Sequence, residues 1–193
     1  MTAASSRFIL ICSGKGGVGK TTLTANLGIA LARQGARTAV LDADFGLRNL
    51  DLLLGLENRI VFTAQEVLAG SCRLEQALVK HKQEPNLALL PAGNPRMLEW
   101  LTPDDMRKVA QMVGEHFDYV LIDAPAGIEG GFRNAMAAAS EAIGQLSHTP
   151  LKIHAYSLIQ GGLAIALIVF TVQLWLPLRQ LGWVQASSPA PEA

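Results

Sequence analysis

A glycine-rich segment near the N-terminus has the residue types and the spacing needed to hold phosphate groups. Gly14-Lys-Gly-Gly-Val-Gly-Lys-Thr21 fits the pattern GxxxxGK[ST]. Its glycines let the backbone curl until successive N–H groups face phosphate oxygens. In this pattern Lys20 reaches the β- and γ-phosphates, and the Thr21 hydroxyl ligates Mg²⁺. The alternative is an ordinary glycine-rich turn without a ligand. The predicted strand before the segment and the predicted helix after it favour the phosphate-binding interpretation.

The elements around this segment are those of a parallel α/β sheet. Residues 8–12 form a continuous apolar run, which is typical of a strand covered on both faces. A helix is expected directly after the glycines, at 21–34, and Gly35 would end it. Further expected strands are 38–41, 87–90 and 119–123, and further expected helices are 61–70, 102–116 and 131–143. Strands that alternate with helices predict a parallel-sheet P-loop NTPase fold with right-handed crossovers.

Three aspartates follow the predicted strands. Asp42 and Asp44 come after the second strand, and Asp123 ends the fourth. The carboxyl ends of parallel strands meet at one rim of a sheet, so these acids can converge on the phosphate segment. A strand-ending aspartate is by itself more often a turn former. Beside the glycine segment, a role in phosphoryl transfer is favoured for Asp44 and Asp123 first, and then for Asp42.

Longer stretches of the sequence carry a family resemblance. The stretches are Lys15-Gly-Gly-Val-Gly-Lys-Thr-Thr22, Leu41-Asp-Ala-Asp-Phe-Gly-Leu-Arg-Asn-Leu-Asp-Leu-Leu-Leu-Gly55, Leu89-Leu-Pro-Ala-Gly93 and Leu121-Ile-Asp-Ala-Pro-Ala-Gly-Ile-Glu129. Over residues 8–143 the chain resembles the ParA/MinD family of deviant Walker A ATPases. Partition ATPases and nitrogenase iron proteins share the glycine segment, but residues 45–51 favour the MinD branch of the family.

The resemblance implies roles for individual residues. Lys15 matches the signature lysine, which in the family reaches the partner's phosphates across an ATP-sandwiched dimer. Asp44 matches the water-activating aspartate, Asp42 an acid on the Mg²⁺ side, and Asp123 the Walker B acid. The expected catalytic residues are Lys15, Lys20, Asp44 and Asp123, and the expected metal ligands are Thr21, Asp42 and Asp123. The residues expected to bind ATP are Gly14, Gly16, Gly17, Val18, Gly19, Lys20, Thr21, Thr22 and Asn49.

The resemblance also implies partners and a place in the cell. In the family, ATP drives dimerisation and membrane attachment, so a homodimer, MinC, MinE and the membrane are the expected partners. The chain has 16 basic and 16 acidic residues, and this balance gives no support for binding nucleic acid. Cys12 and Cys72 have no CxxC spacing, which fits a reducing cytosol. We therefore expect a cytoplasmic ATPase domain at the inner face of the cell membrane.

The resemblance stops near Ile143, where family members continue into further core strands. We expect the family fold to be truncated or fused here, with 1–143 as the ATPase domain and strand 8–12 left as an exposed edge. Residues 144–157 would be a linker and 179–193 a disordered tail. Residues 158–178 are long and apolar enough for a transmembrane helix. The alternative for that segment is a buried core helix that covers the exposed edge.

Two functions of different classes remain open from the sequence. The first is a MinD-like, Mg²⁺-dependent ATPase that acts in bacterial division-site placement. The second is a membrane-anchored nucleotide-binding module without productive turnover, because a permanent anchor would abolish reversible attachment. ATP turnover that depends on Lys15 would distinguish the first from the second.

Overall fold

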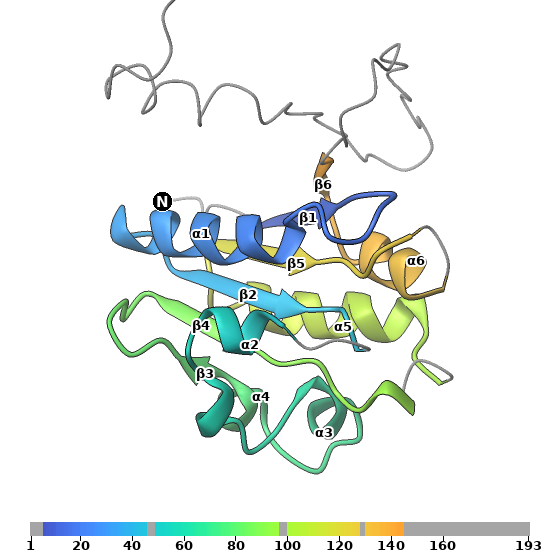
Figure 1. Cartoon of the computed structure of the whole chain (residues 1–193). Coiled ribbons are helices and arrows are strands. Elements are labelled where there is room, and N and C mark those ends of the chain that lie inside the picture. The colour runs from blue at the N-terminus through green and yellow to red at the C-terminus, as the bar shows by residue number, and fades with distance from the viewer. Residues whose placement is uncertain (1–5, 46–48, 97–99, 128–129, 145–193) are drawn as a thin grey trace, which may run out of the picture.

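The computed structural model describes residues 6–45, 49–96, 100–127 and 130–144 of the 193-residue chain. These residues form a six-stranded sheet with the strand order β3-β4-β2-β5-β1-β6 (Figure 1). The strands are β1 (Arg7–Cys12), β2 (Thr38–Asp42), β3 (Val79–Lys80), β4 (Leu87–Leu90), β5 (Tyr119–Asp123) and β6 (Glu141–Gly144). All pairs are parallel except β3 with β4, which is antiparallel. The expected α/β class is confirmed.

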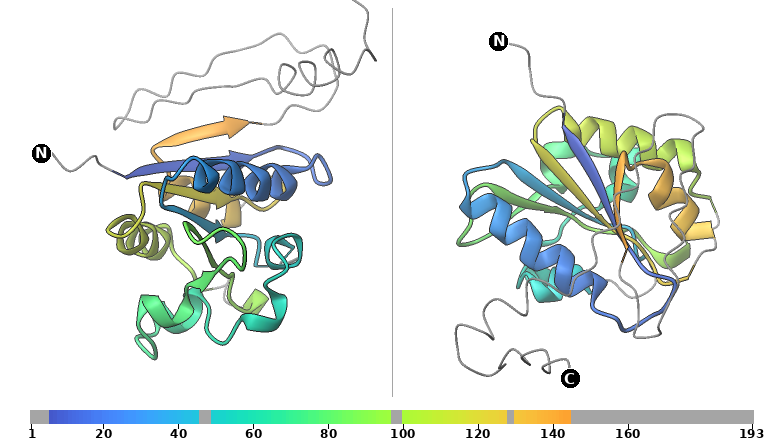
Figure 2. Two further views of the ribbon diagram at one scale, coloured as in Figure 1. Left: turned by 90° about the vertical axis from the view of Figure 1, so that its left-hand side faces the viewer. Right: turned by 90° about the horizontal axis from the view of Figure 1, so that it is seen from above.

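Helices cover both faces of this sheet, as the views in Figures 1 and 2 show. They are α1 (Lys20–Arg33), α2 (Leu50–Leu53), α3 (Ala64–Leu68), α4 (Leu74–Ala77), α5 (Pro103–Gly114) and α6 (Gly130–Ala137), with a 3₁₀ turn η1 (Glu57–Arg59). Helices α1 and α2 pack on one face, and α3, α5 and α6 contribute to the core of the other. Because both faces are covered, the central strands are apolar at the positions between their ends.

The side chains of the strands divide between these two cores. In β5, Val120 and Ile122 join the core beneath α5, whereas Leu121 joins the core beneath α1. Leu10 and Ile11 of β1 separate in the same way. This alternation explains why the strands read as continuous apolar runs in the sequence.

Helices α3 and α5 lie within the expected ranges 61–70 and 102–116, and each begins at a capping threonine. The Thr102 hydroxyl accepts a hydrogen bond from the Asp105 amide at 3.2 Å, and the Asp105 carboxylate accepts one from the Thr102 amide at 3.0 Å. This reciprocal capping box precedes Pro103, the first residue of α5. Thr63 caps α3 in the same manner through Glu66.

The end of the domain differs from the prediction. Helix α6 ends at Ala137 instead of running to Ile143, and Glu141–Gly144 forms β6, parallel to β1. The Ser140 amide donates to the Phe8 carbonyl at 2.9 Å, which starts the pairing. The expectation that β1 is an exposed edge is therefore wrong, since β1 lies between β5 and β6. Pairing with the apolar β1 outweighs the helix propensity of the alanine-rich stretch.

The predicted apolar helix at 158–178, the linker after Gly144 and the tail at 179–193 lie outside the described residues. Among the helices that are described, none combines the length and the apolar character that crossing a bilayer demands.

Candidate nucleotide-binding site

The loop between β1 and α1 is shaped by glycines with a left-handed backbone. Gly17 has φ 70° and Gly19 has φ 90°, a region that residues with a β-carbon rarely enter. Gly19 is also the N-cap of α1 and offers no side chain to the first amides of that helix. Those amides have no acceptor within the helix, and the positive end of its dipole adds to them. The backbone therefore presents an anion-binding surface at this loop.

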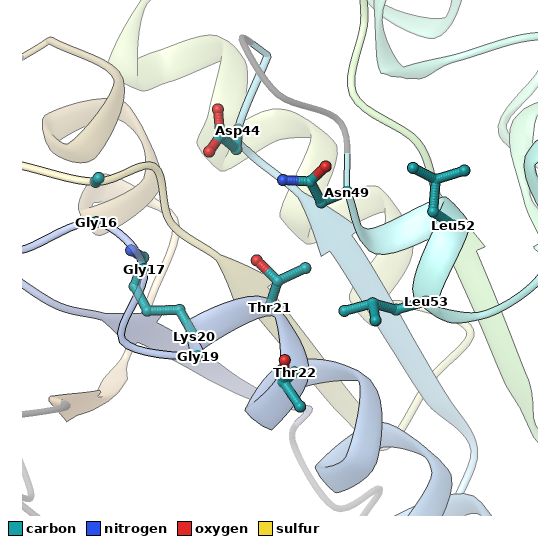
Figure 3. A pocket seen from close by; sticks show the side chains of 11 residues that line it. Gly16, Gly17, Gly19, Lys20, Thr21, Thr22, Asp44, Asn49, Leu52 and Leu53 are labelled. Atoms are coloured by element: carbon teal, nitrogen blue, oxygen red, sulfur yellow. The ribbon is translucent and has the colours of Figure 1, made fainter.

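Two side chains hold the loop from within. The Ser13 hydroxyl accepts from the Lys15 amide and donates to the Lys15 carbonyl, both at 3.1 Å. Lys20 is buried, and its ammonium group donates to the same carbonyl at 3.5 Å. Figure 3 shows the Lys20 side chain running back along the loop toward Gly17. Since a phosphate oxygen is a stronger acceptor for an ammonium group than a neutral carbonyl, an anion in the loop would compete for Lys20.

A cavity of about 430 Å³ opens between this loop and α2. Its lining residues are Gly16, Gly17, Gly19, Lys20, Thr21, Thr22, Asp44, Asn49, Leu52, Leu53 and Ala126. Figure 3 shows Thr21, Asp44 and Asn49 around the same space, with Leu53 beyond them. Leu52 and Leu53 are 60% and 51% exposed and give the cavity an apolar wall. The cavity thus combines a phosphate-type loop with a hydroxyl, an acid and an amide.

Asp42 and Asp123 lie side by side at the ends of β2 and β5, next to the cavity but outside its lining. They are register partners, and they are 5% and 1% exposed. The Ala43 amide donates to the Asp123 carbonyl at 3.0 Å, so the two strand ends are joined beyond the paired residues. The Asp44 amide donates to the Asp42 carboxylate at 2.9 Å. This hydrogen bond closes a tight turn after β2, so that Asp42 stays buried while Asp44 lines the cavity.

Burial dominates the protonation of the two buried acids. It raises the pKa of Asp42 to about 7; a backbone hydrogen bond opposes this shift and the charge of Asp123 adds to it. Burial also raises the pKa of Asp123 to about 6, although hydrogen bonds from Thr21 and Thr24 lower it. A cation entering the site would favour the ionised form of both carboxyl groups.

The structure brings most of the predicted residues to one place. Those that line the cavity are Gly16, Gly17, Gly19, Lys20, Thr21, Thr22, Asp44 and Asn49. Gly14, Lys15 and Val18 belong to the same loop but do not line the cavity, and Lys15 is exposed. Asp42 and Asp123 contribute from the buried strand ends instead of from the cavity surface.

Some residues of the site were not found from the sequence. They are Ser13, Thr24, Leu52, Leu53 and Ala126. Thr24 follows Thr21 by three positions in a predicted helix, and this spacing was a usable signal because it puts both hydroxyls on one face. Ala126 gave no signal, since only the fold brings it close to Gly16, where an added β-carbon would lie 3.7 Å from it.

A glycine loop between a buried parallel strand and a helix, with acids at neighbouring strand ends, defines a P-loop nucleotide-binding domain. Comparison with known proteins gives the family. Residues 9–184 match the CobQ/CobB/MinD/ParA nucleotide binding domain, and the chain belongs to this family. It is similar to the septum site-determining protein MinD of Synechocystis, with 59% identity over 138 residues, which are 72% of this chain and 52% of that protein.

Solved structures give the same relationship. A chain of the MinC:MinD cell division protein complex from Aquifex aeolicus matches with a TM-score of 0.66 and 46% identity, over 73% of this chain and 56% of that one. MinD from Pyrococcus horikoshii, complexed with Mg-ADP, matches with a TM-score of 0.65 and 37% identity, over 72% and 57% of the two chains. This chain spans about half the length of the curated relatives it matches.

Proposed function

We propose that this chain is a Mg²⁺-dependent ATPase of the MinD type that acts in bacterial division-site placement. The observation that carries the proposal is that a single cavity is lined by Lys20 and Thr21 of the glycine motif and by Asp44 and Asn49. The names of its relatives, which are septum site-determining proteins, support the biological role. The relative from Pyrococcus horikoshii that was solved with Mg-ADP supports the choice of ligand.

The residues of the loop would bind and orient the triphosphate. Backbone amides from Gly16 to Gly19 and the start of α1 would hold its oxygens, with Lys20 moving from the Lys15 carbonyl to the phosphates. When bound, ATP presents the phosphoryl group for transfer, and Mg²⁺ neutralises its charge. Asp44 would orient the attacking water.

The chemistry of the donor set fits Mg²⁺. The Thr21 hydroxyl and the Asp42 and Asp123 carboxylates are hard oxygen ligands. No group of three or more His, Cys, Asp or Glu side chains within the described ranges forms a cage for a metal ion. The three oxygen donors named above suit an ion that keeps several of its waters and is also held by phosphates.

Lys15 would act on a second copy of the chain. It is exposed and does not line the cavity of its own loop, so a role in binding its own nucleotide has no support from the geometry. The family role, in which this lysine reaches across an ATP-dependent dimer, suits that position. We therefore propose a homodimer formed around the nucleotide.

We also propose that the domain works in the cytoplasm at the inner face of the membrane, where residues 158–178 would attach it. MinC and MinE are the proposed partners, and the Aquifex aeolicus relative that was solved in complex with MinC supports the first of them. Neutral overall charge gives no support for a DNA-partition role.

The test is ATP hydrolysis by the purified chain with Mg²⁺, with and without vesicles of bacterial lipids, together with nucleotide affinity measured separately. Lys20→Ala is expected to weaken nucleotide binding by at least about tenfold, because it removes a phosphate contact. Lys15→Ala is expected to keep affinity within about twofold while it abolishes turnover, because its target is the partner's phosphate. Lys82→Ala is the control, since this exposed lysine precedes β4 at the opposite end of the sheet.

Equal loss of affinity in the Lys15 and Lys20 variants would contradict the dimer role of Lys15. Tight binding with no turnover under either condition would overturn the ATPase proposal and support the anchored nucleotide-binding module instead.

A further inference from the structure

A buried hydroxyl on α1 connects the glycine loop to the acid at the end of β5. Thr24 is fully buried and does not line the cavity. Its Oγ1 lies 3.0 Å from the Lys20 carbonyl oxygen and 3.1 Å from Oδ1 of Asp123. A threonine inside a helix commonly donates to the carbonyl four residues earlier, and that contact alone would be local. The contact with Asp123 joins two elements that are 99 residues apart in the chain.

The two acceptors compete for one proton. A threonine hydroxyl has a single hydrogen, and the Lys20 carbonyl and the Asp123 carboxylate can only accept. When Asp123 is ionised, the carboxylate is the stronger acceptor, because a charged acceptor makes the shorter and stronger bond. The hydroxyl therefore turns toward Asp123 in the charged state of the site.

Asp123 depends on α1 for its donors. Its side chain is 1% exposed, so water reaches it poorly, and both Thr21 and Thr24 hydrogen-bond to it. The two threonines lie one turn apart on the same face of α1. Thr21 lines the cavity and Thr24 does not, so only Thr24 can hold the carboxylate without also meeting a ligand.

We propose that Thr24 is a positioning residue that fixes the Asp123 carboxylate beneath the phosphate loop, in the orientation that Mg²⁺-nucleotide binding uses. This inference rests on the proposed function in its Mg²⁺-nucleotide part. Thr24 touches neither nucleotide nor metal and acts through Asp123. Without its hydroxyl, the carboxylate loses a buried donor and is free to change its rotamer.

The test measures the affinity of the full chain for N-methylanthraniloyl-ADP by fluorescence, once with Mg²⁺ and once with EDTA. The ratio of the two affinities is the gain due to Mg²⁺. Thr24→Val removes the hydroxyl and keeps the shape of the side chain, and it is expected to reduce this gain about tenfold. Affinity in EDTA is expected to stay within about twofold of the wild type, because the glycine loop is unchanged. Thr24→Ser keeps the hydroxyl and should retain the gain.

A matched control separates this role from packing. Thr38 is also fully buried, and its hydroxyl donates to the Ala36 carbonyl at 3.1 Å, at the start of β2 and so at the far end of the sheet. Thr38→Val should lower the melting temperature and leave the Mg²⁺ gain unchanged. If Thr24→Val does not fold, Thr24→Ser and Thr24→Ala form a second pair that differs in the hydroxyl alone, with the gain expected only in the serine variant.

A folded Thr24→Val or Thr24→Ala variant with the wild-type Mg²⁺ gain would overturn the role of Thr24 and leave the proposed function standing. A wild-type chain that binds no Mg²⁺-nucleotide would overturn both. Equal losses of the gain in Thr24→Val and Thr38→Val would also overturn the positioning role, because they would trace the effect to general loosening of the fold.

Discussion

At the scale of single residues, the site concentrates negative charge where water is scarce. Asp42 and Asp123 are neighbours on adjacent strands, and burial raises the pKa of each. An isolated buried carboxylate is costly, so the protein must supply donors or a cation. Thr21 and Thr24 serve Asp123 in this way, and the Asp44 amide serves Asp42. A divalent cation would therefore stabilise the ends of β2 and β5 most when both acids are ionised.

The stability of the metal-free chain should depend on Asp42 in a predictable direction. Its pKa is about 7 in the fold, whereas the ordinary pKa of an aspartate is 3.8. A raised pKa means that the fold favours the protonated form of Asp42. The stabilisation that this protonation gives is complete below about pH 4 and is lost as pH rises through about 7. Asp42→Asn keeps an oxygen acceptor for the Asp44 amide and cannot ionise. In EDTA we expect it to be more stable than the wild type by about 2–4 kcal/mol at pH 8, and equal to it near pH 4.

Urea unfolding of both proteins across this pH range measures the effect. Asp118→Asn provides a control of opposite sign, because hydrogen bonds and charge from Arg37 lower the pKa of Asp118. That variant should lose stability relative to the wild type at neutral pH, and the difference should shrink as pH falls through the acid's lowered pKa. A constant offset for Asp42→Asn at every pH would contradict the burial argument.

At the scale of elements, the close approach of α1 to the sheet sets the position of the site. Gly28 faces the strands, and a β-carbon built on it would lie 2.9 Å from Cγ1 of Val40 and 3.3 Å from Cδ1 of Leu87. A larger residue would push the helix outward. Because Thr21 and Thr24 belong to this helix, their contacts with Asp123 depend on that spacing.

Gly28→Val should therefore destabilise the domain by at least about 2 kcal/mol, since stiff, buried Val40 cannot yield easily. Ala30→Val changes an exposed position of the same helix and should cost only about 0.5 kcal/mol through helix propensity. Chemical denaturation of both variants checks the prediction. Similar losses in the two would mean that α1 does not pack as closely as this glycine indicates.

Elements were predictable from the sequence where a local signal was strong. Apolar runs marked β1, β2, β4 and β5, and the expected helix ranges 61–70 and 102–116 contain α3 and α5. The four residues of β6 carry no such signal, because an alanine-rich stretch favours helix until pairing with β1 is considered. The same limit applies to the site. The phosphate loop and its acids follow from strand–loop–helix order, and Thr24 could have been found from its helical spacing to Thr21. Ala126 is identified only by its contact across the fold.

At the scale of the whole molecule, the described residues gather three loops at one rim of the sheet. The segments after β1, β2 and β5 each contribute to the cavity, through the glycine loop, Asp44 and Ala126 respectively. The groups that line it suit phosphates: backbone amides, Lys20 and hydroxyls. Leu52 and Leu53 can pack against any ring and cannot distinguish one base edge from another. Affinity in this chain should therefore come from the triphosphate.

Competition against N-methylanthraniloyl-ATP in the presence of Mg²⁺ tests whether affinity comes from the triphosphate or from the base. GTP should compete within about fivefold of ATP, since a base edge contributes little more than 1 kcal/mol here. AMP should compete at least about a hundredfold more weakly than ATP, and adenosine not at all, because each lacks the oxygens that the loop binds.

Asn49 is the lining amide able to hydrogen-bond a base, so Asn49→Ala would reduce whatever preference for ATP is observed. A preference for ATP over GTP above about a hundredfold, unchanged in Asn49→Ala, would contradict triphosphate-dominated binding and assign base recognition to another part of the chain.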